Sequence, residues 1–203
     1  LRSRHSPWKR LAFALGAMGL FLLGYQWGNE YQRRHAKPPQ ISGVLVRPPA
    51  AIPGFRLADP FGRPFDQETL AAGWTLLTFG DLAGAPGQLA IQRLIDLYNR
   101  VAGEEDLHRS LRLVLVTTSD APNLARDFAR LSPALYVLSG EATEQERLRA
   151  ALGVGTEPEQ PLFVFAPGGY LVALLTDQGD GAVLATDLIA LHQGVQVLLP
   201  EKP

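Results

Sequence analysis

Short apolar runs alternate with amphipathic stretches along most of the chain. The apolar runs have the length of buried strands, and they cover residues 74–79, 111–117, 135–138, 162–165 and 170–175. Between them, apolar residues recur at the spacing of one helical face, as do Leu94, Ile95, Tyr98 and Val101. This alternation arises when helices cover a mainly parallel sheet, so the pattern predicts an α/β domain with a central mixed sheet flanked by helices.

The same pattern predicts four helices. They cover residues 88–101, residues 123–131, a segment opened by a T-x-x-E capping box of Thr143 and Glu146, and residues 182–193. The stretch FRLADPFGRPFD alternates apolar and polar residues on both sides of a turn at 59–62, which predicts a short hairpin. The acidic run of Glu104, Glu105 and Asp106 is interpreted as a solvated loop after a helix. We therefore place the folded domain at residues 55–203.

The N-terminal region departs from this pattern. Residues 11–29, LAFALGAMGLFLLGYQWGN, contain no charge, and a helix of about 20 residues spans the core of a bilayer. Basic residues precede this run, which predicts a bacterial inner-membrane protein with residues 1–10 in the cytoplasm and the C-terminal domain in the periplasm. A cleaved signal peptide is the alternative, because the apolar run is short, although no A-x-A-like site follows it.

Two features of this region are candidates for contact with a partner. Ala12, Gly16 and Gly24 form a stripe of small residues that would let another membrane helix approach closely, although such residues are frequent in membrane helices in any case. Residues 30–54 are basic and proline-rich, which predicts a linker. Its YQRRHAK stretch would contact lipid headgroups or a protein, or serve only as an interfacial anchor.

Composition removes several classes of function. The net charge of -1 and the lack of an interleaved basic and aromatic surface argue against nucleic acid as a partner. The hydrophobic content of 46% argues against disorder. Among the 203 residues there is no cysteine, which excludes disulfides, thiolate metal ligands and thiol nucleophiles together.

The segment GVLVRPPAAIPGFRLADPFGRPFDQETLAAGWTLLTFG resembles the opening of the Sco/SenC family, the membrane-anchored thioredoxin-like copper chaperones of cytochrome c oxidase. It matches a V-L-x-x-P-like arm, then F-x-L-x-D-x-x-G-x-P-F, then L-x-G-x-W-x-L-L-x-F-G. The later segments RLVLVTTSD, LSGEATEQERLRAALGV and FVFAPGGYLV follow in the expected order, so the resemblance covers about residues 43–193. It implies a thioredoxin-like fold in which Pro161 faces the loop after the strand at 74–79.

The resemblance also implies which residues are missing. Family members bind copper through a C-P-x-x-C-type loop and a distant histidine, whereas this loop reads APGQL. Ala85 and Leu89 stand at the two cysteine positions, and Pro158 or Glu159 stands at the histidine position. Copper(I) prefers thiolate, thioether and imidazole donors, but Met18 lies in the apolar segment and no two histidines have a ligand spacing such as i, i+4. We therefore predict no metal and no cofactor.

An apolar loop in place of a reactive one favours protein contact. The sequence predicts a non-enzymatic, membrane-anchored accessory subunit or assembly factor of a respiratory complex, with cytochrome c oxidase or another haem-copper oxidase as the partner. The candidate contact residues of the domain are Ala85, Pro86, Leu89 and Pro161. A copper or other metal or ligand chaperone or sensor with a non-cysteine site is the alternative.

A third hypothesis is an enzyme that uses carboxylates at the end of the sheet. Asp81 lies in the loop, and Thr117, Ser119 and Asp120 end the next long strand, where ligand sites of α/β proteins often lie. Asp81 has no histidine or second carboxylate nearby in the sequence. Asp120 is better explained as a helix cap.

Overall fold

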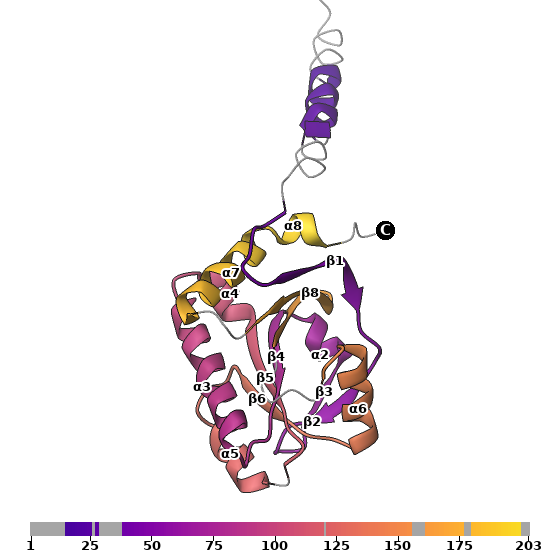
Figure 1. Cartoon of the computed structure of the whole chain (residues 1–203). Helices are drawn as coiled ribbons and strands as arrows, with labels where there is room; N and C mark the ends of the chain where they lie inside the picture. Colours follow the sequence, from indigo (N-terminus) through magenta and orange to yellow (C-terminus); the bar gives the residue numbers. More distant parts are fainter. Residues whose placement is uncertain are drawn as a thin grey trace, which may run out of the picture. The chain divides into compact units, whose positions relative to one another are not determined.

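The computed structural model describes residues 15–25, 27–28, 38–119, 121–155, 161–176 and 180–199. The chain divides into two compact units, Leu1–Pro38 and Pro39–Pro203. In the first unit, residues 15–25 and 27–28 are helical (Figure 1). Among the described residues, no helix has both the length and the apolar character needed to cross a membrane. Residues 11–14, 26 and 29 of the predicted span lie outside the described residues, and the transmembrane helix stays a prediction.

A six-stranded mixed sheet forms the centre of the second unit (Figure 1). Its strands, in spatial order, are β1 (Val44–Ala51), β8 (Tyr170–Leu175), β7 (Leu162–Ala166), β4 (Trp74–Phe79), β5 (Leu111–Val116) and β6 (Leu135–Leu138). β4, β5 and β6 are parallel, whereas β7 is antiparallel to β4, β8 to β7 and β1 to β8. The five predicted strands are confirmed at nearly the same bounds. The prediction succeeded because continuous apolar runs of this length suit strands that are buried on both faces.

Helices and a hairpin cover the two faces of this sheet. On the face reached by Trp74 and Leu76 lie α3 (Ala85–Arg100) and α7 (Gly181–Gln193). The face reached by Leu77 and Phe79 is covered by the hairpin of β2 (Arg56–Ala58) and β3 (Pro64–Asp66), with α2 (Gln67–Ala71) and α6 (Ala142–Ala151). The second unit also contains α4 (Glu105–Ser110), α5 (Pro122–Ala129) and α8 (Val195–Leu198). Alternate residues of β4 therefore supply two separate apolar cores.

The folded unit begins earlier than predicted. The residues of β1 fall in the range 30–54 that was predicted as a linker, yet β1 pairs with β8 at the edge of the sheet, where proline is tolerated. The buried carboxylate of Asp187 on α7 accepts hydrogen bonds from the backbone N–H groups of Ser42 (3.0 Å) and Gly43 (3.3 Å). The start of the domain therefore moves from residue 55 to Pro39.

Two local predictions are wrong. The N-cap of α6 is Glu141, so Thr143 lies inside the first turn and does not open a capping box. The acidic run forms the beginning of α4, with Glu104 as the N-cap and with Glu105 and Asp106 in the first turn. Carboxylates are favourable there because they face the positive end of the helix dipole, so these residues support a helix where a loop was expected.

Candidate functional site

The loop between β4 and α3 lies at the carboxyl end of the parallel strands, where α/β folds often place ligand sites. It starts at Gly80 and ends at Gly84, the N-cap of α3. Pro86 occupies the first turn of α3, where its missing N–H would have no helical partner. Ala85, Pro86 and Leu89 are all exposed, Leu89 to 57%. The candidate contact residues of this loop and helix start thus present an apolar surface.

Hydrogen bonds tie this loop to the end of β5. The backbone N–H of Leu82 donates to Oγ1 of Thr117 over 3.1 Å, and the N–H of Ala83 donates to Oγ of Ser119 over 3.2 Å. The side chain of Leu82 is buried in the core, and Thr117 is only 2% exposed. The loop therefore has an apolar anchor in the core and polar attachments to the neighbouring strand.

Asp81 completes this network. Its Oδ1 accepts hydrogen bonds from the hydroxyl of Ser119 and from the N–H of Ala83, the latter over 3.0 Å. The bond from Ser119, and then the bond from Ala83, hold the pKa of Asp81 below its ordinary value of 3.8. Asp81 is therefore a charged acceptor that holds the loop, and its low pKa makes it a poor general base.

Gly87 lets α3 begin directly against this loop. A Cβ at Gly87 would lie 2.2 Å from the carbonyl oxygen of Asp81, which no side chain tolerates. A Cβ at Gly80 would in turn lie 3.0 Å from Cα of Gly87. The backbone of the loop and the first turn of α3 are in direct contact, and glycine permits this close approach.

Pro161 lies at the same end of the sheet as the loop. Its carbonyl oxygen accepts a hydrogen bond from Oγ1 of Thr78 over 3.3 Å, and Thr78 is the penultimate residue of β4. That Pro161 faces the loop, as the family resemblance implies, stays a prediction. Pro158 and Glu159 lie outside the described residues, so the histidine position stays a prediction.

The remaining contact candidates belong to the first unit. Gly16 and Gly24 are in the helical residues 15–25, and a Cβ on either would meet no described atom within 4 Å. Ala12 lies outside the described residues. The role of this small-residue stripe stays a prediction.

The described histidines lie at the opposite end of the sheet from the loop. His192 on α7 packs edge-on against Trp74, the first residue of β4, with ring centroids 5.7 Å apart. His108 on α4 contacts Tyr98 with ring centroids 3.9 Å apart, and α4 leads directly into the start of β5. The loop follows the last residue of β4, so neither imidazole is placed to serve it.

The residues at the loop do not fit a copper ion. Ala85 and Leu89 offer no donor atom, and copper(I) needs soft sulfur or imidazole donors. Within the described part of the chain, no group of three or more His, Cys, Asp or Glu side chains could hold a metal. His5 and His35 lie outside it, and so does Asp120, which leaves the hypothesis of paired carboxylates without a test.

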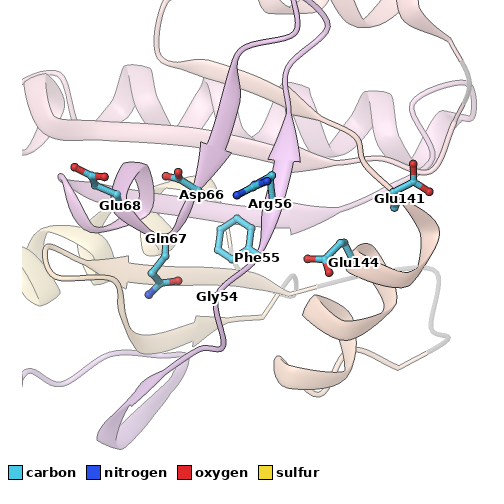
Figure 2. Close-up of a pocket in the computed structure, with 8 residues that line it drawn as sticks. All are labelled: Gly54, Phe55, Arg56, Asp66, Gln67, Glu68, Glu141 and Glu144. Carbon is cyan, nitrogen blue, oxygen red and sulfur yellow. The ribbon is translucent and has the colours of Figure 1, made fainter.

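A separate hollow lies between the hairpin, α2 and the start of α6 (Figure 2). This acidic groove has a volume of about 720 Å³, and its walls carry the carboxylates of Asp66, Glu68, Glu141 and Glu144. Two of these already have partners. Asp66 accepts from the N–H of Thr69 over 3.0 Å as the N-cap of α2, and Glu144 pairs with Arg147 at 2.6 Å. Sequence reasoning missed the groove because its walls come from segments far apart in the chain.

Comparison with known proteins shows what this chain is similar to. No protein-family model matches it. A protein of Stutzerimonas stutzeri named "Putative copper-binding protein" is 30% identical over 132 residues, or 62% of this chain. The matched region spans 63% of that relative's length.

Solved structures show the same fold. Yeast Sco1 with copper bound has a TM-score of 0.61 at 18% identity, covering 76% of this chain and 98% of that chain. BsSco, described as a member of the Sco family of cytochrome c oxidase assembly proteins, has a TM-score of 0.58 at 16% identity, covering 76% and 99%. The chain is therefore a thioredoxin-like α/β protein. Sco/SenC proteins are among its structural neighbours, and the resemblance seen in the sequence is confirmed.

Proposed function

We propose that this chain is a divergent member of the Sco/SenC family that acts by protein contact, as a non-catalytic accessory subunit or assembly factor of a respiratory complex. The expected partner is cytochrome c oxidase or another haem-copper oxidase. One observation carries the proposal: the loop after β4 keeps the position of a reactive site but exposes Ala85, Pro86 and Leu89. No reaction step can be assigned to these side chains.

The size of the apolar surface sets limits on this role. Burying the exposed part of Leu89 in an interface would contribute about 1 kcal/mol. A stable interface needs about 800 Å² on each partner, which the loop alone does not provide. The loop would therefore be one part of a larger contact, and other faces of the domain and the predicted membrane segment would supply the rest.

Location completes the proposal. Residues 11–29 would anchor the chain in a bacterial inner membrane, with the N-terminus in the cytoplasm and Pro39–Pro203 in the periplasm. The anchor would pack against helices of the complex through the stripe of Ala12, Gly16 and Gly24. The domain would then cover an external face of the oxidase near its copper or cytochrome c site.

The test is purification of the native membrane complex through a tag on this chain. The proposal predicts that haem and copper subunits copurify with the chain after mild detergent extraction. A Leu89→Ser variant, matched to a Leu131→Ser control with a similarly exposed leucine, would retain less of the oxidase. A chain that purifies without haem and copper subunits would contradict the proposal.

A copper or other metal chaperone or sensor is the second candidate, and the name of the Stutzerimonas stutzeri relative favours it. Equilibrium dialysis of the full chain against copper(I) and copper(II) separates the two. Contact alone predicts no stoichiometric, tight uptake of either ion. Uptake of one tightly bound copper per chain would support the chaperone or sensor.

A further inference from the structure

The backbone of the β4–α3 loop is held at nearly every position. The N–H of Gly80 donates to the carbonyl of Val116 and the N–H of Gly84 to the carbonyl of Asp81, both over 3.1 Å. Between them, Leu82 and Ala83 donate to side chains at the end of β5 and to Asp81. Four of the five residues 80–84 thus donate a backbone hydrogen bond within the domain.

Thr117 is the centre of this network. Its Oγ1 accepts from the N–H groups of Leu82 (3.1 Å) and Ser119 (3.2 Å), and its hydroxyl donates to Oγ of Ser119 over 3.1 Å. Ser119 donates in turn to Asp81. The bond from Leu82 to Thr117 is buried, so water cannot readily replace it if the acceptor is lost.

We infer that Thr117, Ser119 and Asp81 are positioning residues that lock this loop in one conformation. The lock makes Ala85, Pro86 and Leu89 a docking surface that is ordered before the partner arrives. This second step rests on the proposed function. Ordering a flexible loop at the moment of binding costs conformational entropy, so an already ordered loop preserves affinity that a mobile one would lose.

The lock is tested by hydrogen exchange of the full chain in detergent, followed by mass spectrometry. Thr117→Val has nearly the same shape but removes the acceptor for Leu82, and Ser119→Ala removes one acceptor for Ala83 and the donor to Asp81. Thr118→Val is the matched control, because Thr118 is exposed and lies between the two. We expect exchange over residues 80–89 to become about tenfold faster in Thr117→Val and several-fold faster in Ser119→Ala, the range expected for one hydrogen bond.

The outcomes separate the lock from general destabilisation. In Ser119→Ala, exchange over β4 and β5 should stay at the rate of the unmodified chain while the loop exchanges faster. If Thr117→Val speeds hydrogen exchange over the whole sheet, that variant is destabilised in general, and the exchange of Ser119→Ala alone tests the lock. Equal loop exchange in Ser119→Ala and Thr118→Val would overturn the lock.

The docking step needs a second readout, which is retention of the haem-copper oxidase on the tagged chain. Thr117→Val and Ser119→Ala should lose retention together with loop protection, whereas Leu89→Ser should lose retention with loop exchange unchanged. A loosened loop with full retention would overturn the link between the lock and docking. An unmodified chain that retains no oxidase would contradict the proposed function, and the exchange data would still decide the lock.

Discussion

The β4–α3 loop and the acidic groove of Figure 2 are two surface features of the domain that look like sites for different reasons. The groove is large and carries four carboxylates, whereas a cavity beside the loop, which Thr117 and Ser119 help to line, has a volume of about 70 Å³. In the groove, Asp66 and Glu144 already serve the protein's own backbone and side chains. At the loop, Asp81, Thr117 and Ser119 hydrogen-bond within the domain, whereas Ala85, Pro86 and Leu89 face solvent. The groove is a candidate site because of its volume and charge. The loop is a candidate site because it lies at the carboxyl ends of β4 and β5, where α/β folds often place ligand sites.

The largest expected effect is a loss of stability on substitution of Gly87, where the first turn of α3 contacts the backbone of the loop. Alanine in place of glycine normally stabilises a helix by about 1 kcal/mol. In Gly87→Ala, however, the new Cβ would meet the carbonyl of Asp81 at 2.2 Å, so we expect a loss of about 1–3 kcal/mol in the free energy of unfolding. Urea denaturation measures it. Gly103→Ala is the control, because a Cβ there meets nothing within 4 Å. Equal stability of the two variants would refute the contact between the loop and α3.

The next effect concerns the apolar surface of the loop. Leu89→Ser should change the free energy of unfolding by no more than about 0.5 kcal/mol, because the side chain is exposed. It should weaken binding of the purified oxidase roughly tenfold if Leu89 sits at the centre of the interface. Surface-immobilised oxidase and full chain in detergent provide the measurement. Leu131→Ser, at a residue 63% exposed just after α5, should bind like the unmodified chain, and a matching loss in both variants would argue against a specific role of the loop.

Low pH should remove stabilising hydrogen bonds from both the β4–α3 loop and the acidic groove. Hydrogen bonds from Thr69 hold the pKa of Asp66 low, as Ser119 and Ala83 do for Asp81. For carboxyls whose folded pKa is depressed, the stabilisation is complete above the unfolded value, here 3.8, and is lost as pH falls through the lower folded pKa. Asp81→Asn should therefore flatten the fall in the urea midpoint below about pH 5. An unchanged pH profile in this variant would show that Asp81 carries no such linkage.

The smallest effect is expected in the groove. Glu144→Gln removes an ion pair with Arg147 whose side chains are 28% and 64% exposed. Exposed pairs of this kind contribute about 0.5 kcal/mol or less, which thermal unfolding can bound. Retention of the oxidase should not change. A marked loss of retention in Glu144→Gln would reverse the comparison and make the groove the contact surface.

The sheet was predictable because its central strands are continuous apolar runs. β4 and β8 have the predicted bounds, since apolar runs of this short length are typical of strands buried on both faces of a sheet. β1 was missed because its prolines suggest an extended linker, and its pairing of Ala50 with Leu171 depends on residues distant in the sequence. Composition cannot reveal a partner of that kind.

The position of the candidate site was predictable from the family resemblance, but its internal structure was not. Leu82 and Thr117 are 35 residues apart and Asp81 and Ser119 are 38 apart, so no local pattern joins them. One signal was available: parallel strands that end at one edge bring their following residues together. The close contact at Gly87 leaves no trace in the sequence beyond a glycine in the first turn of a helix.

The central claim is that this thioredoxin-like domain works by contact with an oxidase and without copper of its own. The most direct measurement is the ratio of haem to chain in the complex purified through a tag on this protein. The account predicts a fixed ratio that survives washing and falls in Leu89→Ser but not in Leu131→Ser. A chain that elutes free of haem from membranes rich in the oxidase would contradict it.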